Sequence, residues 1–459
     1  MPKTTRFVLL LGALILLLPL LAACGGGDEA EPTNAPLTES SDTTPDVTPT
    51  REPAAPSEST PSASPATDES TPATQTGEST PTTGEASTPA APDTVEATAT
   101  SAPVDPAAPA SPPAAEQPRS GGFAYGWNVA LRGDDGGQEH NLNTSYAVQG
   151  TGFGWVRFQL EWQQFERNPD QWDPLPMDRV IQDLANSGLK ILITVAKAPE
   201  WALDPAGEQF LSDYADFQNF MQFVADRYHG QVHAWEIWNE QNLAHEVNGT
   251  VRAADYVELL KAGFNGIRAV DQESLVVFGG LTPNGVNDPS IAIDDVQYLN
   301  EVYAFNNGEV KDYFDIMGAH VSATQTTPDN TWPDDPGAEG WSDHPSFFFR
   351  RAEELRQVMI DHGDADKSMW LTEFGWTTEN QAPGYEYGTF NSEEDVAQYL
   401  TRSFEIMLNE WDWVSGAFVW NLNWSTLAPP EDEKFPWSAV NAEWTPRPAY
   451  DAMRALPKN

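Results

Sequence analysis

Two glutamates stand among aromatic residues at the ends of two apolar runs. Glu240 lies in the segment WEIWNEQN, and Glu373 lies in the segment LTEFGW. A pair of carboxyl groups can cleave a glycosidic bond when one protonates the leaving oxygen and the other attacks or stabilises the anomeric carbon. Tryptophan faces suit the stacking of sugar rings. A single glutamate after a strand is usually a solvated loop residue, so the argument depends on both being brought to one place.

Eight short apolar runs are candidates for the buried strands that would position these glutamates. Between the runs lie segments in which apolar residues recur with the period of a helix. Repeated strand and helix units of this kind predict a single (β/α)8 barrel, the TIM barrel, rather than two domains. A doubly wound sheet is the alternative, but no Gly-x-Gly-x-x-Gly turn follows the first run. The runs begin at Phe123, Trp155, Lys190, Ala234, Leu275, Phe314, Met369 and Val414.

Glu240 follows the fourth predicted strand, and Glu373 ends the seventh. In a (β/α)8 barrel the carboxyl ends of all strands meet at one face, where active sites lie. The predicted fold therefore brings the two carboxyl groups to the same face.

The two segments resemble those of glycoside hydrolase clan A, whose members are retaining enzymes with the acid/base and nucleophile glutamates at the ends of strands four and seven. The similarity is greatest to family 39 and its endo-acting bacterial relatives, and next to family 5 cellulase-like enzymes. The resemblance implies that Glu240 is the acid/base and Glu373 the nucleophile. It also implies that Asn239 binds the sugar 2-hydroxyl and that Arg157 lies beside the nucleophile. Alternatively, Arg157 pairs with Glu236 or Glu161 within the barrel.

His320 ends the sixth predicted strand, where the clan often has a histidine followed two residues later by a tyrosine. This chain has Ser322 at the tyrosine position. The resemblance therefore implies a substrate-binding role for His320, and a residue of the following loop would have to replace the tyrosine. A lone histidine is equally well explained as a satisfied core residue.

Other aromatic and polar residues lie at predicted strand ends. Trp420, on the eighth strand, matches the aromatic platform that the clan places under the sugar, although core packing would also explain it. Asn128 and Trp201 are candidates for lining the cleft, with loop packing as the alternative. Glu236 lies within the fourth strand and is expected to hydrogen-bond inside the barrel.

Two long loops at strand ends are candidates for shaping a substrate groove, because long ordered loops on a barrel are commonly functional. Residues 322–344 carry Trp332 and Trp341, and residues 425–446 carry Trp437 and Trp444. Solvated loops that merely cover the barrel are the alternative.

The composition excludes several classes of protein. The chain has 69 Asp and Glu against 24 Lys and Arg, a formal net charge of -45 that repels nucleic acid. A single cysteine rules out a disulfide framework. The seven histidines form no metal-binding motif, and no phosphate-binding glycine loop appears, so neither a metal nor a cofactor is expected.

The first residues have the pattern of an export signal. Residues 1–23 combine basic residues, an apolar run and a small-residue cleavage site before Cys24, which resembles the lipobox of bacterial lipoproteins. The resemblance implies lipidation of Cys24 and an extracytoplasmic, membrane-anchored protein; an ordinary signal peptide with a stray cysteine is the alternative. Residues 24–118 are rich in Ser, Thr, Pro, Ala and Glu, a composition typical of a disordered tether. The barrel domain is then residues 119–459.

The sequence thus predicts a retaining glycoside hydrolase for a β-linked poly- or oligosaccharide, anchored through Cys24 and monomeric. A non-catalytic glycan-binding lipoprotein on the same barrel is the alternative from another class. An enzyme that trims a polysaccharide exported by its own cell would share the chemistry and differ only in its biological role.

Overall fold

The computed structural model describes residues 122–333 and 344–458. The predicted export signal, Cys24, the tether and Trp341 lie outside these residues.

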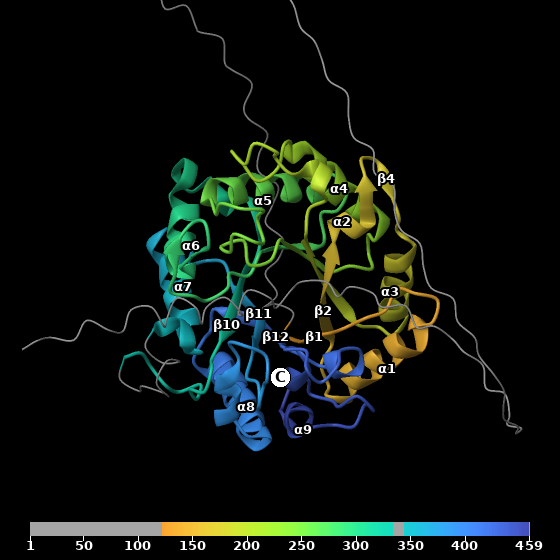
Figure 1. Cartoon of the computed structure of the whole chain (residues 1–459), viewed down its shortest axis with the longest axis vertical. Helices are drawn as coiled ribbons and strands as arrows, with labels where there is room; N and C mark the ends of the chain where they lie inside the picture. The colour runs from red at the N-terminus through yellow and green to blue at the C-terminus, as the bar shows by residue number, and fades with distance from the viewer. Residues whose placement is uncertain (1–121, 334–343, 459) are drawn as a thin grey trace, which may run out of the picture. The chain divides into compact units, whose positions relative to one another are not determined.

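Within the described residues, eight parallel strands form one sheet in the order β10-β11-β12-β1-β2-β5-β6-β7. A parallel bridge between Val277 and Ile316 joins the two edge strands, which closes the sheet into a barrel. The predicted (β/α)8 fold is therefore confirmed (Figure 1). The strands are β1 (Ala124–Asn128), β2 (Trp155–Glu161), β5 (Lys190–Ala196), β6 (Ala234–Ile237), β7 (Leu275–Phe278), β10 (Met317–Ser322), β11 (Met369–Gly375) and β12 (Val414–Val419).

Each barrel strand is followed by a helix that packs on the outside of the barrel (Figure 1). Helix α8 illustrates why these segments are helical: a capping box of Ser392 and Asp395 starts it, and a buried stripe that includes Val396, Leu400 and Phe404 faces the sheet. The outer helices are α1 (Gly137–Gly150), α3 (Leu175–Asn186), α4 (Tyr214–Arg227), α5 (Ala253–Arg268), α6 (Asp295–Ala304), α7 (Arg351–Asp361), α8 (Glu393–Asn409) and α9 (Pro448–Ala455).

The loops carry short elements that the sequence did not predict. A one-turn helix α2 (Trp162–Phe165) and the hairpin of β3 (Glu166–Asn168) and β4 (Gln171–Trp172) follow β2, and a second hairpin, β8 (Asn287–Asp288) with β9 (Ala292–Ile293), follows β7. The 3-10 helices are η3 (Glu200–Ala202), η4 (Phe305–Tyr313), η5 (Pro345–Phe347), η6 (Glu386–Phe390), η7 (Trp424–Thr426) and η8 (Phe435–Trp437). None of the helices in the described ranges is long and apolar enough to cross a membrane.

The inside of the barrel has an apolar layer beneath a polar one. Because side chains alternate along a strand, Arg157 lies two residues beyond the apolar Trp155 and points to the same side, and Glu236 likewise follows Ala234. The polar layer is thereby placed toward the carboxyl ends of the strands. The apolar layer consists of Ala124, Leu192, Ala234, Val277, Ile316, Trp370 and Phe418, with Trp155 and Leu275 packed against it.

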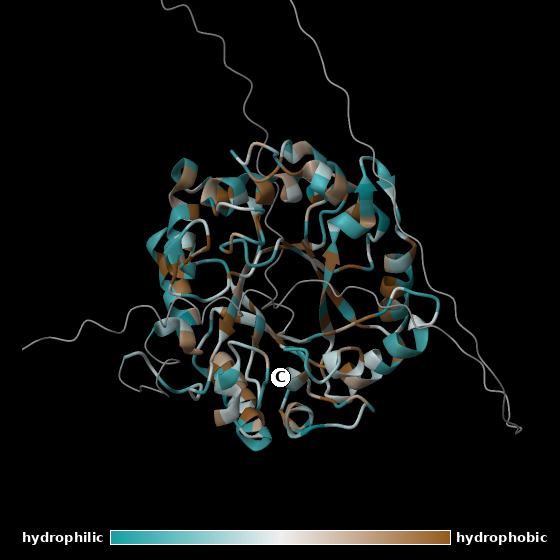
Figure 2. Cartoon of the chain, viewed as in Figure 1, coloured by the Kyte–Doolittle hydropathy of each residue, from teal (hydrophilic) through white to brown (hydrophobic). Residues whose placement is uncertain are grey.

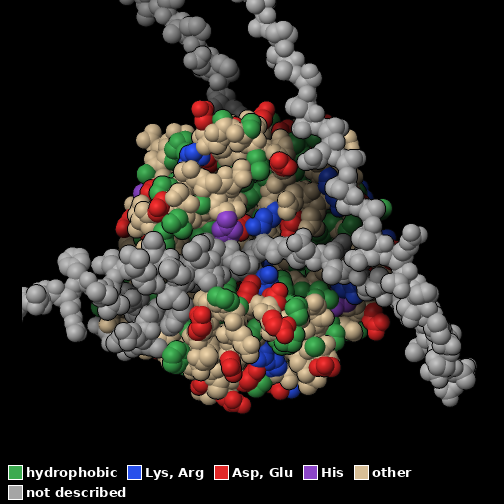
Figure 3. Space-filling model, viewed as in Figure 1, with side chains coloured by type: hydrophobic (Ala, Val, Ile, Leu, Met, Phe, Trp, Pro, Cys, Tyr) green, Lys and Arg blue, Asp and Glu red, His purple; other side chains and the backbone are tan. Residues whose placement is uncertain are grey.

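A second apolar core lies between the barrel strands and the outer helices. Figure 2 shows the hydrophobic residues on the strands and on the inward faces of the helices, with hydrophilic residues outside. Figure 3 shows Asp and Glu side chains scattered over the visible face, as the acidic composition requires. The core holds the strand ends in fixed positions, on which the candidate site depends.

Candidate active site

One pocket at the carboxyl ends of the barrel strands contains both candidate glutamates. Glu240 comes from the segment after β6, Glu373 from β11 and His320 from β10, so residues far apart in sequence meet here. The pocket is lined by Glu240, Thr282, Pro283, His320, Ser322, Glu373, Phe374, Gly375, Tyr385, Tyr387, Trp420, Glu433 and Trp437.

Glu240 is positioned by an unusual backbone turn after β6. Trp238 and Glu240 have φ angles of 71° and 51°, in the left-handed region that side-chain-bearing residues rarely adopt. The Glu240 amide donates a hydrogen bond of 2.9 Å to the Gly280 carbonyl beyond β7. Each such residue costs roughly 1–2 kcal/mol, so the surrounding structure holds the turn against its own strain.

Glu373 is turned toward the site by a bulge in β11. Strict alternation from Trp370, which points into the barrel, would direct residue 373 to the outer side of the sheet. The pairing between β10 and β11 shifts by one residue, so that Ala319 pairs with Leu371 but His320 pairs with Glu373, leaving Thr372 without a partner in the register. A bulge of this kind re-aims a side chain. His320 and Glu373 thereby face the same pocket.

Arg157 joins the two carboxylates of the polar layer. Its Nε donates to Glu236 at 2.7 Å and its Nη1 to Glu373 at 2.6 Å, and both side chains of the Arg157–Glu236 pair are almost fully buried. Arg157 also donates to Asn128 Oδ1 at 2.8 Å and to Asn239 Oδ1 at 3.0 Å. Both pairings considered for Arg157, one with Glu373 and one with Glu236, are therefore present at once.

His320 lies between the two candidate catalytic glutamates. Its Nδ1 is 3.2 Å from Glu240 Oε1, and its Nε2 is 3.7 Å from Glu373 Oε1. One ligand-type atom from each of the three residues lies within 4.8 Å of the others. The residue types would suit a metal ion, but Arg157 already places a cation 2.6 Å from the same Glu373 oxygen, which would repel a second one.

The protonation states of these groups depend on one another. Burial lowers the pKa of His320, but Glu373 and Glu240 outweigh it and raise that pKa. Burial raises the pKa of Glu240, yet the hydrogen bond and charge of His320 lower it below the usual value. Burial raises the pKa of Glu373 and the charge of Glu240 adds to this, against the opposing pull of His320 and Arg157. When His320 loses its proton, Glu240 loses the interaction that kept it ionised, whereas Glu373 retains Arg157.

The other residues predicted from the sequence, Trp420, Asn128 and Trp201, differ in whether they line the pocket. Trp420 lines the pocket and its ring lies 4.8 Å from that of Trp424; the peptide bond that follows it is cis. Asn128 is buried below the pocket, where its Nδ2 donates to the Thr372 carbonyl at 3.0 Å. Trp201 does not line the pocket: its ring packs on Trp162, and its N–H donates to a backbone carbonyl of β3.

Sequence reasoning missed several pocket residues, three of which have ionisable side chains. Tyr385 and Tyr387 come from the loop between β11 and α8, and Glu433 from the loop after β12. Among the described residues, the phenols of the pocket therefore come from the loop after strand seven, and not from the loop after strand six. The recurrence of tyrosine in GYEYG was the available signal. Of the loop tryptophans, Trp437 lines the pocket, whereas Trp332 is partly exposed and lies 6.1 Å from Phe348.

Gly280 was also missed, and it is expected to matter because His320 packs directly on it. A Cβ at this position would overlap the His320 imidazole and meet Thr372 Oγ1 at 2.8 Å. We expect Gly280→Ala to displace His320 and lower any catalytic activity of this site, measured as kcat/KM, by about 10- to 100-fold, since small misplacements in a site have effects of this size. Gly154→Ala is the matched control, because its Cβ would meet nothing within 4 Å. Wild-type activity in Gly280→Ala would show that His320 has no positioning role.

The fold and the place of the pocket define a (β/α)8 barrel with a candidate active site at the carboxyl ends of its strands. No protein-family profile and no curated protein matches the sequence. Among solved structures, the chain is similar to a family 39 glycoside hydrolase from the gut symbiont Bacteroides cellulosilyticus WH2, with a TM-score of 0.53 and 16% identity over 73% of this chain and 63% of that one. It is also similar to the GH39 enzyme from Xanthomonas axonopodis pv. citri, with a TM-score of 0.51 and 15% identity over 74% of this chain and 67% of that one.

At this level of identity the likeness is one of fold: the chain shares the (β/α)8 barrel of these two enzymes. It spans just under two thirds of the length of the Bacteroides enzyme. The assignment of catalytic roles therefore depends on the site itself.

Proposed function

We propose that the protein is a retaining glycoside hydrolase that cleaves β-linked poly- or oligosaccharides with Glu240 and Glu373. The observation that carries this proposal is the closeness of the two carboxyl groups, which bring one oxygen each within 4.8 Å. Retaining enzymes hold their carboxyl groups about 5–5.5 Å apart, whereas inverting enzymes need about 6.5–9.5 Å to admit a water molecule.

In the first step Glu373 attacks the anomeric carbon while Glu240 protonates the departing oxygen. Arg157, at 2.6 Å from Glu373, favours the ionised nucleophile throughout, because an arginine stays charged at any working pH. Burial raises the pKa of Glu240, so Glu240 holds a proton more readily once His320 is neutral. In the free site, however, the pKa of Glu373 lies above its usual value and that of Glu240 below it, so the proposed roles require a proton to pass to Glu240 when substrate binds.

In the second step a water molecule releases the sugar from the Glu373 ester. Glu240, now ionised, accepts a proton from that water, so the proton given to the leaving group is recovered. His320, hydrogen-bonded to Glu240, can hold the carboxyl in place through both steps. Asn239, whose Oδ1 accepts a hydrogen bond from Arg157, is proposed to bind the sugar 2-hydroxyl.

The first product is expected to keep the β configuration, because two successive inversions restore the starting geometry. The measurement is proton NMR during hydrolysis of an aryl β-glycoside. Spectra from the first minutes show the anomeric configuration of the product before mutarotation changes it. An α anomer as the first product would exclude a glycosyl-enzyme on Glu373.

We further propose that the barrel is carried outside the cytoplasm as a lipoprotein, anchored through Cys24 with residues 24–118 as a tether. The sequence pattern before Cys24 supports this proposal. In a bacterial host, the wild type is expected in the membrane fraction and Cys24→Ser in the soluble extracytoplasmic fraction or as an uncleaved precursor. Equal partition of both into the soluble fraction would contradict the anchor, without bearing on catalysis.

A further inference from the structure

Glu433 is a buried carboxylate in the pocket that the proposed chemistry leaves unused. Its side chain is only 11% exposed, and neither of its oxygens has a hydrogen-bond partner among the described residues. Lys434 Nζ lies 3.5 Å from Oε1, an ion-pair contact without a hydrogen bond. Burial, together with the charges of Asp432 and Glu373, outweighs Lys434 and raises the pKa of Glu433 to about 7. Buried polar groups in native proteins are almost always partnered, and the ion pair with Lys434 leaves acceptor capacity on the Glu433 carboxylate for a group from outside the chain.

Trp437 supplies a complementary group to the same pocket. Its indole N–H is buried and has no acceptor among the described residues. The indole packs edge-on against Tyr385, with ring centroids 6.4 Å apart and an interplanar angle of 90°. An unpartnered donor and an unpartnered acceptor therefore line one pocket with the candidate nucleophile.

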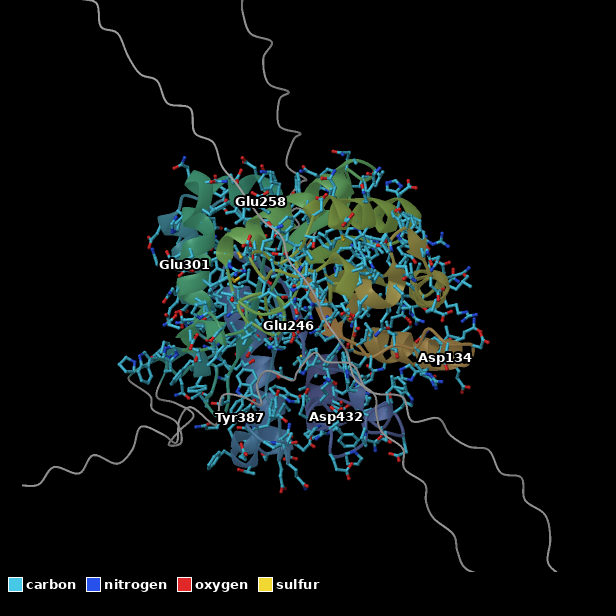
Figure 4. The ribbon with its side chains drawn as sticks, turned by 45° about the horizontal axis from the view of Figure 1, so that its top comes forward. Asp134, Glu246, Glu258, Glu301, Tyr387 and Asp432 are labelled. Atoms are coloured by element: carbon cyan, nitrogen blue, oxygen red, sulfur yellow. The ribbon has the colours of Figure 1, made fainter. Side chains whose placement is uncertain are left out.

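The loop that carries both residues is held by hydrogen bonds to its backbone. Asn380 Nδ2 donates to the Glu433 carbonyl at 2.8 Å, and Asn421 Nδ2 to the Lys434 carbonyl at 3.0 Å. Arg447 Nη1 donates to the Ser438 carbonyl at 2.7 Å. The labelled Tyr387 and Asp432 in Figure 4 belong to the two loops that form this side of the pocket. These bonds fix the backbone of the loop and thereby hold Glu433 and Trp437 at the pocket.

We propose that Glu433 and Trp437 form a subsite that binds hydroxyl groups of the sugar attacked by Glu373, and that this sugar is uncharged. This inference rests on the proposed glycoside hydrolase function and names its substrate class more closely. A sugar hydroxyl can donate to the Glu433 carboxylate and accept from the Trp437 N–H, which satisfies both groups. Above its pKa of about 7 Glu433 is ionised, and a uronic acid would then bring a further carboxylate beside Glu433 and Glu373, which like-charge repulsion disfavours.

The test uses the full chain and a panel of 4-nitrophenyl β-glycosides of glucose, galactose, xylose and glucuronic acid. For the best substrate, its 3-, 4- and, where present, 6-deoxy derivatives are compared in wild type, Glu433→Gln and Trp437→Phe. Because hydrogen bonds to charged groups are stronger than neutral ones, Glu433→Gln is expected to lose about 10- to 100-fold in kcat/KM, and Trp437→Phe about 3- to 10-fold. Glu431→Gln, an exposed glutamate of the same loop, is the control and should match wild type.

The decisive readout is the coupling between residue and hydroxyl. Wild type should lose about 10- to 100-fold with at least one deoxy derivative, and Glu433→Gln should show little further loss with that same derivative. Equal penalties for every deoxy derivative in both proteins would overturn the subsite, as would a preference for the glucuronide.

Calorimetric binding separates this inference from the proposed function. Cello-, xylo- and laminari-oligosaccharides are titrated into wild type and Glu433→Gln after a check for hydrolysis. Binding that is weakened by Glu433→Gln without any turnover would support the subsite and overturn the hydrolase. Turnover unaffected by Glu433→Gln would do the reverse, and neither binding nor turnover of any panel sugar would overturn both.

Discussion

Replacing Glu373 by Ala is expected to lower kcat by at least about 10⁴-fold for every glycoside, because no covalent intermediate can form without the nucleophile. The backbone of β11 keeps its place, so the emptied site can admit a small anion. Added azide should therefore restore part of the rate and give the α-glycosyl azide from a β-glycoside. The measurement is the rate with and without azide, with the product anomer assigned by NMR.

Replacing Glu240 by Ala removes the proton donor instead, and the effect should depend on the leaving group. Substrates with poor leaving groups should slow by about 10²- to 10⁴-fold. Aryl glycosides whose leaving group needs no proton should still form the intermediate and accumulate it, since the base for the second step is also missing. Azide should then attack the intermediate and give the β-azide. The opposite pair of azide anomers would exchange the roles of the two glutamates.

These two variants also separate an enzyme from a binding protein. If the wild type hydrolyses glycosides and neither substitution changes its rate, both residues are outside the active site. If the wild type binds oligosaccharides without hydrolysing them, the glycan-binding alternative holds.

Replacing Arg157 by Met is expected to destabilise the fold and the active site together. It leaves Glu236 fully buried without its cation, and removal of one partner of a buried pair typically costs about 3–5 kcal/mol. It also removes a hydrogen bond and a positive charge from Glu373, so the pKa of Glu373 should rise and activity at low pH should be lost first. Urea unfolding and a pH–rate profile measure the two effects.

A second substitution distinguishes the two contributions of Arg157. In Arg157→Met/Glu236→Gln the uncompensated buried charge is gone, so most of the lost stability should return while activity should not. Arg179→Met is the control, since its partner Asp135 is exposed and the loss should stay within about 0.5 kcal/mol. Full recovery of activity in the double variant would mean that Arg157 acts only by neutralising Glu236.

The sequence was most informative where burial decides the structure. Strands buried on both faces must be continuous apolar runs, so all eight were recognisable. Only the sixth differs appreciably: it was expected from Phe314, whereas β10 begins at Met317 and Ile316 makes the bridge that closes the barrel. The strand ends then predicted that Glu240 and Glu373 lie at the same face of the barrel, and both line one pocket.

The finer geometry could not be predicted, because it depends on pairing between distant segments. The bulge opposite His320 is a property of register, and no local pattern marks Thr372 as the residue without a partner. In the sequence, nothing distinguishes Glu433 from the other acidic residues of its loop. Its burial results from tertiary packing, which no local pattern indicates. Trp201 is the converse case, since its position after a strand suggested the cleft but its N–H is used by the neighbouring hairpin.

At position 240 the residue types that best stabilise the left-handed backbone differ from the residue type that the proposed chemistry requires. Asparagine or glycine would accept a φ of 51° more readily than glutamate does, yet neither can carry the proton. A screen that selects only for thermal stability should therefore enrich asparagine or glycine at position 240, and these variants should be inactive. Engineering of more stable variants of this barrel therefore has to keep Glu240 and introduce stabilising substitutions at other positions.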